Sequence, residues 1–198
     1  MKVTLFKKNP NVYSCNAYLI CGNWNALNDV NTLIDTGTDD FIYNELQTIS
    51  TGVGKRRVEQ IILTHEHFDH AGGLGFLVKQ YNPVVLALSQ SIPVTQKITD
   101  GQKIRVGDRD AQILFTPGHS SDSICIYIPE EKVLFSGDTP LFVKSVGGTY
   151  TRDYVNALKR LVSLNISTIY SGHDYPIIGN AMDILKFTYE NVLKSEIV

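Results

Sequence analysis

The stretch LTHEHFDHAGG, from Leu63 to Gly73, holds three histidines and two acidic residues within positions 65–70. It continues the apolar run VEQIIL at 58–63, which predicts a buried strand. Imidazole and carboxylate groups are ligands of zinc and iron, whereas three crowded imidazoles repel one another once protonated. A metal site therefore explains this loop better than acid and base catalysis does. The helical His-Glu-x-x-His site is excluded, because Asp69 stands four positions after His65.

Local geometry divides this cluster into two pairs. His65 and His67, two residues apart in an extended segment, project the same way and can bind one ion. Asp69 and His70 lie one turn further, where the chain enters a helix, and can point at a neighbouring ion. Phe68 then faces elsewhere, and we expect it to belong to the core.

The remaining two histidines occur in similar surroundings. His119 lies in FTPGHSSDS and His173 in IYSGHDYP, each after a glycine and just past a strand-like run. Asp138 occupies the same kind of position in LFSGDTPLF. Functional groups often lie on loops that a rigid scaffold positions, so we expect these loops to meet at one edge of the fold.

Strand-like and helix-like runs follow one another in the same plan in both halves of the 198-residue chain. We expect helices over Ala71–Tyr81, over TRDYVNALKRLVSL, where Thr151 can cap the start, and from about Asn180 to Lys194. Each half has several strands followed by helices that cover them. This order favours an α/β fold in one domain, 1–198, built as a four-layer α/β/β/α sandwich.

Composition limits the partners. Charged residues make up 19% of the chain and its net charge is −2, which disfavours nucleic acid and anionic lipid as partners. The N-terminus has no long apolar run, so we expect neither a signal peptide nor a membrane span, and a cytoplasmic location. The cysteines Cys15, Cys21 and Cys125 lie in strand-like runs without repeated spacing and are expected to be buried free thiols.

The motifs THEHFDHAGG, TPGHS, SGDT and SGHD together resemble the signature of the metallo-β-lactamase superfamily, from IDTG at 34–37 through SGHDYP. The resemblance implies two divalent metal ions, most often zinc, with iron or manganese as alternatives. The implied ligands are His65, His67 and His119 for one metal, Asp69, His70 and His173 for the second, and Asp138 as the bridge. Asp35 matches a position that supports the histidine loop.

This resemblance also implies a reaction. A hydroxide shared by the two ions would attack a small thioester or ester, with Asp69 and Asp138 as the expected catalytic residues and Asp69 also able to shuttle a proton. Lactone hydrolysis is an alternative that differs only in pocket shape. A mononuclear iron persulfide dioxygenase of the same fold is another, which would use His65, His67 and the Asp138 position for one iron.

Among the superfamily, the chain looks most similar to hydroxyacylglutathione hydrolases, also called glyoxalase II. Tyr175 in GHDYP matches a tyrosine that touches the glutathione moiety there, and Tyr150 in GGTYTRDY matches a second one. Gly148 stands where these enzymes carry a basic residue, so a different thioester or ester is an equal expectation. From strand direction, the segment 9–14 should form a rim loop, with Tyr13 in the pocket wall.

Overall fold

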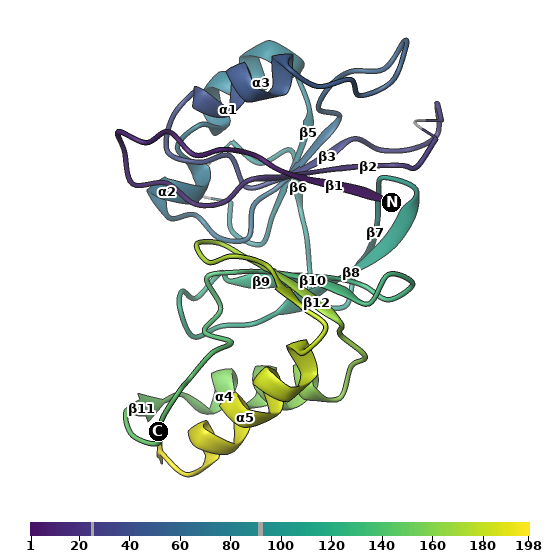
Figure 1. Ribbon diagram of the computed structural model, residues 1–198. Helices are drawn as coiled ribbons and strands as arrows, with labels where there is room; N and C mark the ends of the chain where they lie inside the picture. The colour runs from purple at the N-terminus through teal and green to yellow at the C-terminus, as the bar shows by residue number, and fades with distance from the viewer. Residues whose placement is uncertain (25, 91–92) are drawn as a thin grey trace.

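Two six-stranded sheets face each other in the computed structural model, which describes residues 1–24, 26–90 and 93–198 (Figure 1). The first sheet has the order β1 (Lys2–Leu5), β2 (Tyr18–Cys21), β3 (Thr32–Ile34), β4 (Gln60–Ile62), β5 (Val84–Ala87) and β6 (Gln96–Lys97). The second has the order β13 (Ile177–Ile178), β12 (Thr168–Ser171), β10 (Val133–Gly137), β9 (Ile124–Ile128), β8 (Arg109–Phe115) and β7 (Lys103–Val106). A short pair of strands, β11 (Thr149–Tyr150) and β14 (Glu196–Ile197), lies apart from both.

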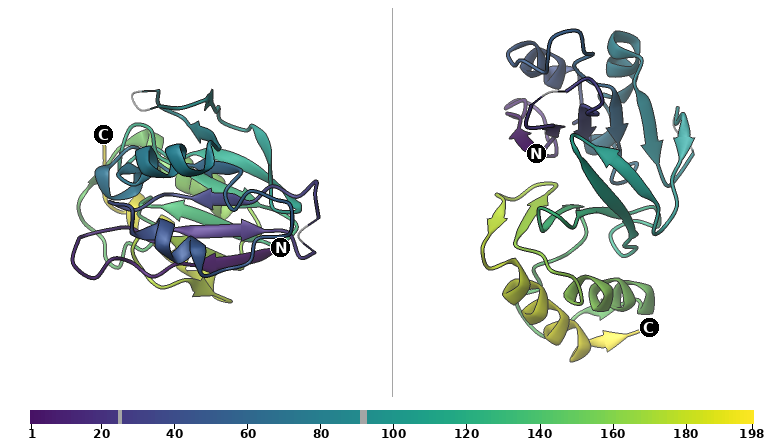
Figure 2. Two further views of the ribbon diagram at one scale, coloured as in Figure 1. Left: turned by 90° about the horizontal axis from the view of Figure 1, so that it is seen from above. Right: turned by 90° about the vertical axis from the view of Figure 1, so that its right-hand side faces the viewer.

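Helices cover the outer faces of both sheets. The right-hand view of Figure 2 shows one helical layer beyond each sheet. The first sheet is covered by α1 (Phe41–Gln47) and α3 (Leu74–Tyr81), and the second by α4 (Arg152–Val162) and α5 (Ala181–Leu193). A short helix, α2 (Phe68–Ala71), precedes α3. The expected four-layer α/β/β/α sandwich is therefore confirmed. None of the helices in the described ranges has the length and apolar character needed to cross a bilayer.

Neighbouring residues on the inner strands point into different parts of the core. Leu33 packs towards the outer helices, whereas Ile34 packs between the two sheets. Ile61 and Ile62 on β4 divide in the same way. Successive side chains of a strand point to opposite faces, and both faces of these sheets are covered. This arrangement explains why the strands read as continuous apolar runs in the sequence.

The helix expected over Ala71–Tyr81 is two shorter helices, because the chain bends at Gly72 and Gly73. A Cβ atom on Gly72 would lie 2.2 Å from the carbonyl oxygen of Thr38, and one on Gly73 would lie 2.4 Å from that of Asp39. Only glycine allows this close approach between the two backbone segments. A contact with a distant loop therefore decides where α2 ends.

Phe68 is not in the core, so that expectation was wrong. Its side chain is 65% exposed and its ring centroid lies 6.5 Å from that of Tyr13. Phe68 is the first residue of α2, whose buried side chains are instead Asp69 and His70. The polar residues occupy the inner face of this helix, which leaves Phe68 on the outer one. The three cysteines, in contrast, are buried and free as expected.

Helix α4 packs as its sequence predicts. Tyr154, Leu158 and Leu161 are buried against the second sheet, and the side chain of Thr151 accepts a hydrogen bond from the backbone N–H of Tyr154 at 3.3 Å.

We expect Thr151→Ala to lower the free energy of unfolding by about 1 kcal/mol, because one N–H at the helix start loses its acceptor. Thr151→Ser keeps the acceptor and is the matched control. Equal urea midpoints for the alanine variant and the original chain would contradict the capping role.

Candidate metal centre

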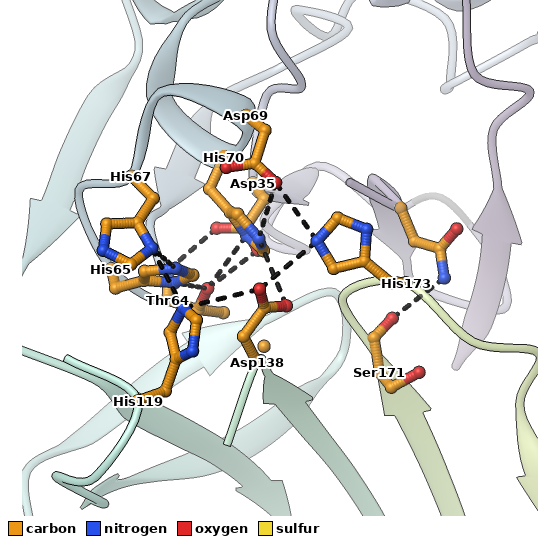
Figure 3. A network of polar contacts seen from close by, with 12 residues as sticks. Asp35, Thr64, His65, His67, Asp69, His70, His119, Asp138, Ser171 and His173 are labelled. Atoms are coloured by element: carbon orange, nitrogen blue, oxygen red, sulfur yellow. Dashed lines mark hydrogen bonds and ion pairs between the residues drawn. The ribbon is translucent and has the colours of Figure 1, made fainter. Parts of the chain in front are cut away.

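All five histidines lie in segments that follow strands and meet at one edge of the sandwich (Figure 3). His65 and His67 follow β4, and His70 lies in α2. From the second sheet, His119 follows β8 and His173 follows β12. These strands end at the same edge because β10 and β12 are parallel and β8 has the same direction as β10. The second sheet also brings Asp138, directly after β10, to this edge.

Three imidazoles form the first group of possible ligands. Nδ1 of His67 lies 3.0 Å from Nε2 of His65 and 2.9 Å from Nε2 of His119. Burial, together with the nearby His70, lowers the pKa of His65 to about 4. Burial also lowers the pKa of His119. Imidazoles that stay neutral keep a lone pair on one ring nitrogen, which is the form that binds a metal ion.

The second group contains two carboxylates and two imidazoles. Nε2 of His173 lies 3.1 Å from Oδ2 of Asp69 and 3.2 Å from Oδ2 of Asp138. Nε2 of His70 lies 3.2 Å from Oδ1 of Asp138. The same carboxylate reaches to 3.6 Å from Nε2 of His119, which belongs to the first group. Asp138 therefore lies between the two groups.

Asp35 supports the loop that carries His65, His67 and His70. Its buried carboxylate accepts hydrogen bonds from the backbone N–H of Thr64 at 2.8 Å and from the Thr64 hydroxyl at 2.9 Å. It also lies 2.8 Å from Nδ1 of His70, which directs the other ring nitrogen towards Asp138. Asp35 has a φ of +57°, a left-handed conformation that aspartate tolerates better than most residues.

Divalent cations fit this donor set. Nε2 of His70 and Oδ1 of Asp138 are buried and lie 3.2 Å from each other, and neither makes a hydrogen bond to another group in the part of the chain that the structure describes. Burial alone would lower the pKa of His70, but the neighbouring carboxylates of Asp35 and Asp138 raise it. His173 and His70 in turn hold the pKa of Asp138 well below its usual range despite burial. Imidazole nitrogens with carboxylate oxygens suit zinc, iron and manganese.

Two further residues fix the loops of the site, and the sequence analysis identified neither. The buried Asn16 donates hydrogen bonds from Nδ2 to the carbonyl oxygens of Ser171 at 3.0 Å and Asp174 at 2.9 Å, on both sides of His173. Asp122 accepts from the backbone N–H of Glu66 at 2.9 Å, between His65 and His67. The one sequence signal for the role of Asn16 is that this polar residue stands just before the apolar strand Tyr18–Cys21.

The three tyrosines from the sequence analysis lie in different surroundings. Tyr13 lies beside the site, with its hydroxyl 3.3 Å from Nε2 of His173, but it is not among the described residues that line the cavity next to the site, where the sequence analysis placed it. Tyr175 is 91% exposed and borders a cavity beside the site. Tyr150 stacks on Tyr154 at 5.6 Å between ring centroids and lies outside the described residues that line this cavity.

This cavity has a volume of about 700 Å³ and lies beside both groups of possible ligands. His119, Asp138 and His173 are among the residues that border it. Its walls are largely apolar and come from the loop after β10, from β12 and β13, and from α5: Leu141, Phe142, Ile169, Ile177 and Ile184. A pocket of this size and character is typical of small-molecule sites.

We expect Asp35→Ala to lower the free energy of unfolding of the metal-free protein by about 2–4 kcal/mol, because it leaves buried groups of Thr64 and His70 without an acceptor. Asp35→Asn keeps one acceptor and tolerates the left-handed backbone, so its loss is expected to be smaller. Urea denaturation measures both. Asp40→Ala, at an exposed carboxylate that makes no capping hydrogen bond, is the control. Equal losses for the Asp35→Ala and Asp40→Ala variants would refute the supporting role.

A model of the metallo-beta-lactamase superfamily matches residues 10–173 of this chain. An atrochrysone carboxyl ACP thioesterase of Aspergillus fumigatus is 32% identical over 145 residues, which cover 71% of this chain and 46% of that protein. A hydroxyacylglutathione hydrolase of Maricaulis maris is 33% identical over 150 residues, which cover 72% of this chain and 56% of that protein. The chain thus spans about half the length of these curated relatives.

Solved structures share the fold. ETHE1 from Myxococcus xanthus superposes with a TM-score of 0.71 at 22% identity, covering 97% of this chain and 88% of that one. A metallo-beta-lactamase family protein from Thermus thermophilus gives a TM-score of 0.69 at 21% identity, covering 95% of this chain and 78% of that one. The match to the family model includes every histidine and aspartate of the two ligand groups, and the chain belongs to the metallo-beta-lactamase superfamily.

Proposed function

We propose that this protein is a binuclear metal-dependent hydrolase that cleaves a small thioester or ester. The observation that carries the proposal is the pair of adjacent donor groups with the Asp138 carboxylate between them. Relatives named as a thioesterase and as a hydroxyacylglutathione hydrolase support the choice of bond. The cavity beside the groups supports a small-molecule substrate.

The proposal assigns a metal-binding role to each residue of the two groups. One metal ion would be held by His65, His67 and His119 and the other by Asp69, His70 and His173, with Asp138 between the two groups as the ligand that both ions would share. When bound, two divalent cations supply hydroxide at neutral pH and polarise the scissile carbonyl. Zinc is the first choice for these cations, and iron and manganese are the alternatives. Asp69 would also accept and return a proton, and its carboxylate lies 3.1 Å from Nε2 of His173.

The cavity orients the substrate. Its apolar walls at Leu141, Ile169 and Ile184 take the apolar part of the substrate and exclude water from it. The scissile bond would then lie next to Asp138 and His173, which border the cavity. Lactone opening would use the same groups. A mononuclear iron dioxygenase would leave Asp69 and His70 without a metal, and the close approach of all four donors in the second group favours the binuclear proposal.

The direct test is metal content together with activity. We expect about two equivalents of metal per chain and thioester hydrolysis that does not depend on oxygen, and we expect chelation to abolish the hydrolysis.

Asp138→Asn should lower kcat/KM by about 100-fold or more, because the shared ligand is weakened. Asp110→Asn, at an exposed carboxylate paired with Arg105, is the control. One iron per chain with oxygen consumption on a persulfide would overturn the proposal, and exclusive lactone turnover would change the substrate class.

A second test uses the tight packing at Gly172. A Cβ atom there would lie 2.0 Å from Oδ1 of Asp138 and 2.8 Å from Cε1 of His70. We expect Gly172→Ala to weaken metal binding by about 10- to 100-fold, because both side chains must move. Gly75→Ala is the matched control, since a Cβ there meets no atom within 4 Å. Competition with a chelating dye measures both affinities, and an unchanged affinity in the Gly172→Ala variant would count against the second group as a metal site.

A further inference from the structure

Tyr13 lies directly against the second ligand group. Its ring stacks on the imidazole of His173, with the centroids 5.0 Å apart and the planes 18° from parallel. Its hydroxyl oxygen lies 3.3 Å from Nε2 of His173, the same atom that faces Asp69 and Asp138. The hydroxyl therefore lies beside the ring nitrogen of His173 that faces both carboxylates, at the border of the site.

The backbone holds this ring in place. Tyr13 belongs to the loop between β1 and β2, which Figure 1 shows in purple beside α2. Its carbonyl oxygen accepts a hydrogen bond from the hydroxyl of Thr38, and the next residue, Ser14, accepts one from the backbone N–H of Thr38 at 3.1 Å. The backbone N–H of Cys15 donates to the carbonyl oxygen of Asp69 at 3.2 Å. The loop is thus attached to α2 and to the segment before α1, although the Tyr13 side chain itself is 66% exposed.

The Tyr13 O–H group is available as a hydrogen-bond donor once the site binds metal. A histidine nitrogen that gives its lone pair to a metal ion no longer accepts a hydrogen bond. The Tyr13 O–H, on a side chain that is 66% exposed, is then free to donate to water or to a substrate oxygen beside His173. A tyrosine hydroxyl is protonated at neutral pH, and a carbonyl oxygen that gains negative charge is a strong acceptor.

We propose that Tyr13 is a catalytic residue whose O–H donates a hydrogen bond to the substrate carbonyl oxygen as that oxygen becomes negatively charged. This inference rests on the proposed hydrolase function and adds a residue to it. The competing explanation is that the ring only shields His173. Tyr13→Phe separates the two roles, because it keeps the stacked ring and removes the hydroxyl.

The kinetic test compares metal-loaded protein with Tyr13→Phe, Tyr13→Ala and the control Tyr43→Phe, whose ring packs on Phe76 away from the site. We expect Tyr13→Phe to lower kcat by roughly 10- to 100-fold with KM and metal content little changed. The control should match the original protein. Full activity in Tyr13→Phe, or a loss seen only in Tyr13→Ala, would overturn the inference and leave the hydrolase proposal intact.

A binding test decides the inference even without turnover. Butylphosphonate carries a tetrahedral anionic head that mimics the charged oxygen, and calorimetry gives its affinity for each metal-loaded variant. We expect binding about 10-fold weaker in Tyr13→Phe than in the original protein. Equal affinities, or no binding to either, would refute hydrogen-bond donation by Tyr13. A protein that hydrolyses no thioester but shows the expected difference would overturn the proposed function alone.

Discussion

The carboxylate of Asp35 is the constraint on which the rest of the site depends. It joins the end of β3 to the loop after β4, because it binds both the backbone and the hydroxyl of Thr64 and also Nδ1 of His70. Since Asp35 orients the His70 ring, it also determines which nitrogen faces Asp138. A buried charge of this kind is stable only where it is paired and fully hydrogen-bonded. Asp35, Thr64 and the two groups of possible metal ligands therefore form one polar network within an apolar sandwich.

The four layers explain why that network lies at an edge. Both faces of each sheet are apolar and covered, so polar side chains collect where the strands end. The first sheet contributes His65 and His70 there, and the second contributes Asp138 and His173. Cations held between these groups would link the two halves of the chain and stabilise the folded state, since the unfolded chain has no such site. The loop after β10 and α5 contribute residues to the wall of the cavity next to them.

Local patterns predicted much of the fold and failed where distant segments touch. The apolar face of α4 and its cap at Thr151 follow from residues within one helix, and both are observed. The split between α2 and α3 depends on Gly72 and Gly73 meeting the backbone of residues 38–39, which no helical pattern records. The exposure of Phe68 has the same origin, because the short helix turns its polar side inwards.

The chemistry of the site can be predicted from the amino-acid sequence: which donors are present, how His65, His67 and His70 are spaced along one loop, and which family they indicate. These features are local, since neighbouring residues have only a few conformations open to them. The position of Asp138 between the two ligand groups and the stacking of Tyr13 on His173 are instead set by the folded chain. Such contacts join residues far apart in the chain, so their distances depend on how the two sheets pack and not on any spacing in the sequence.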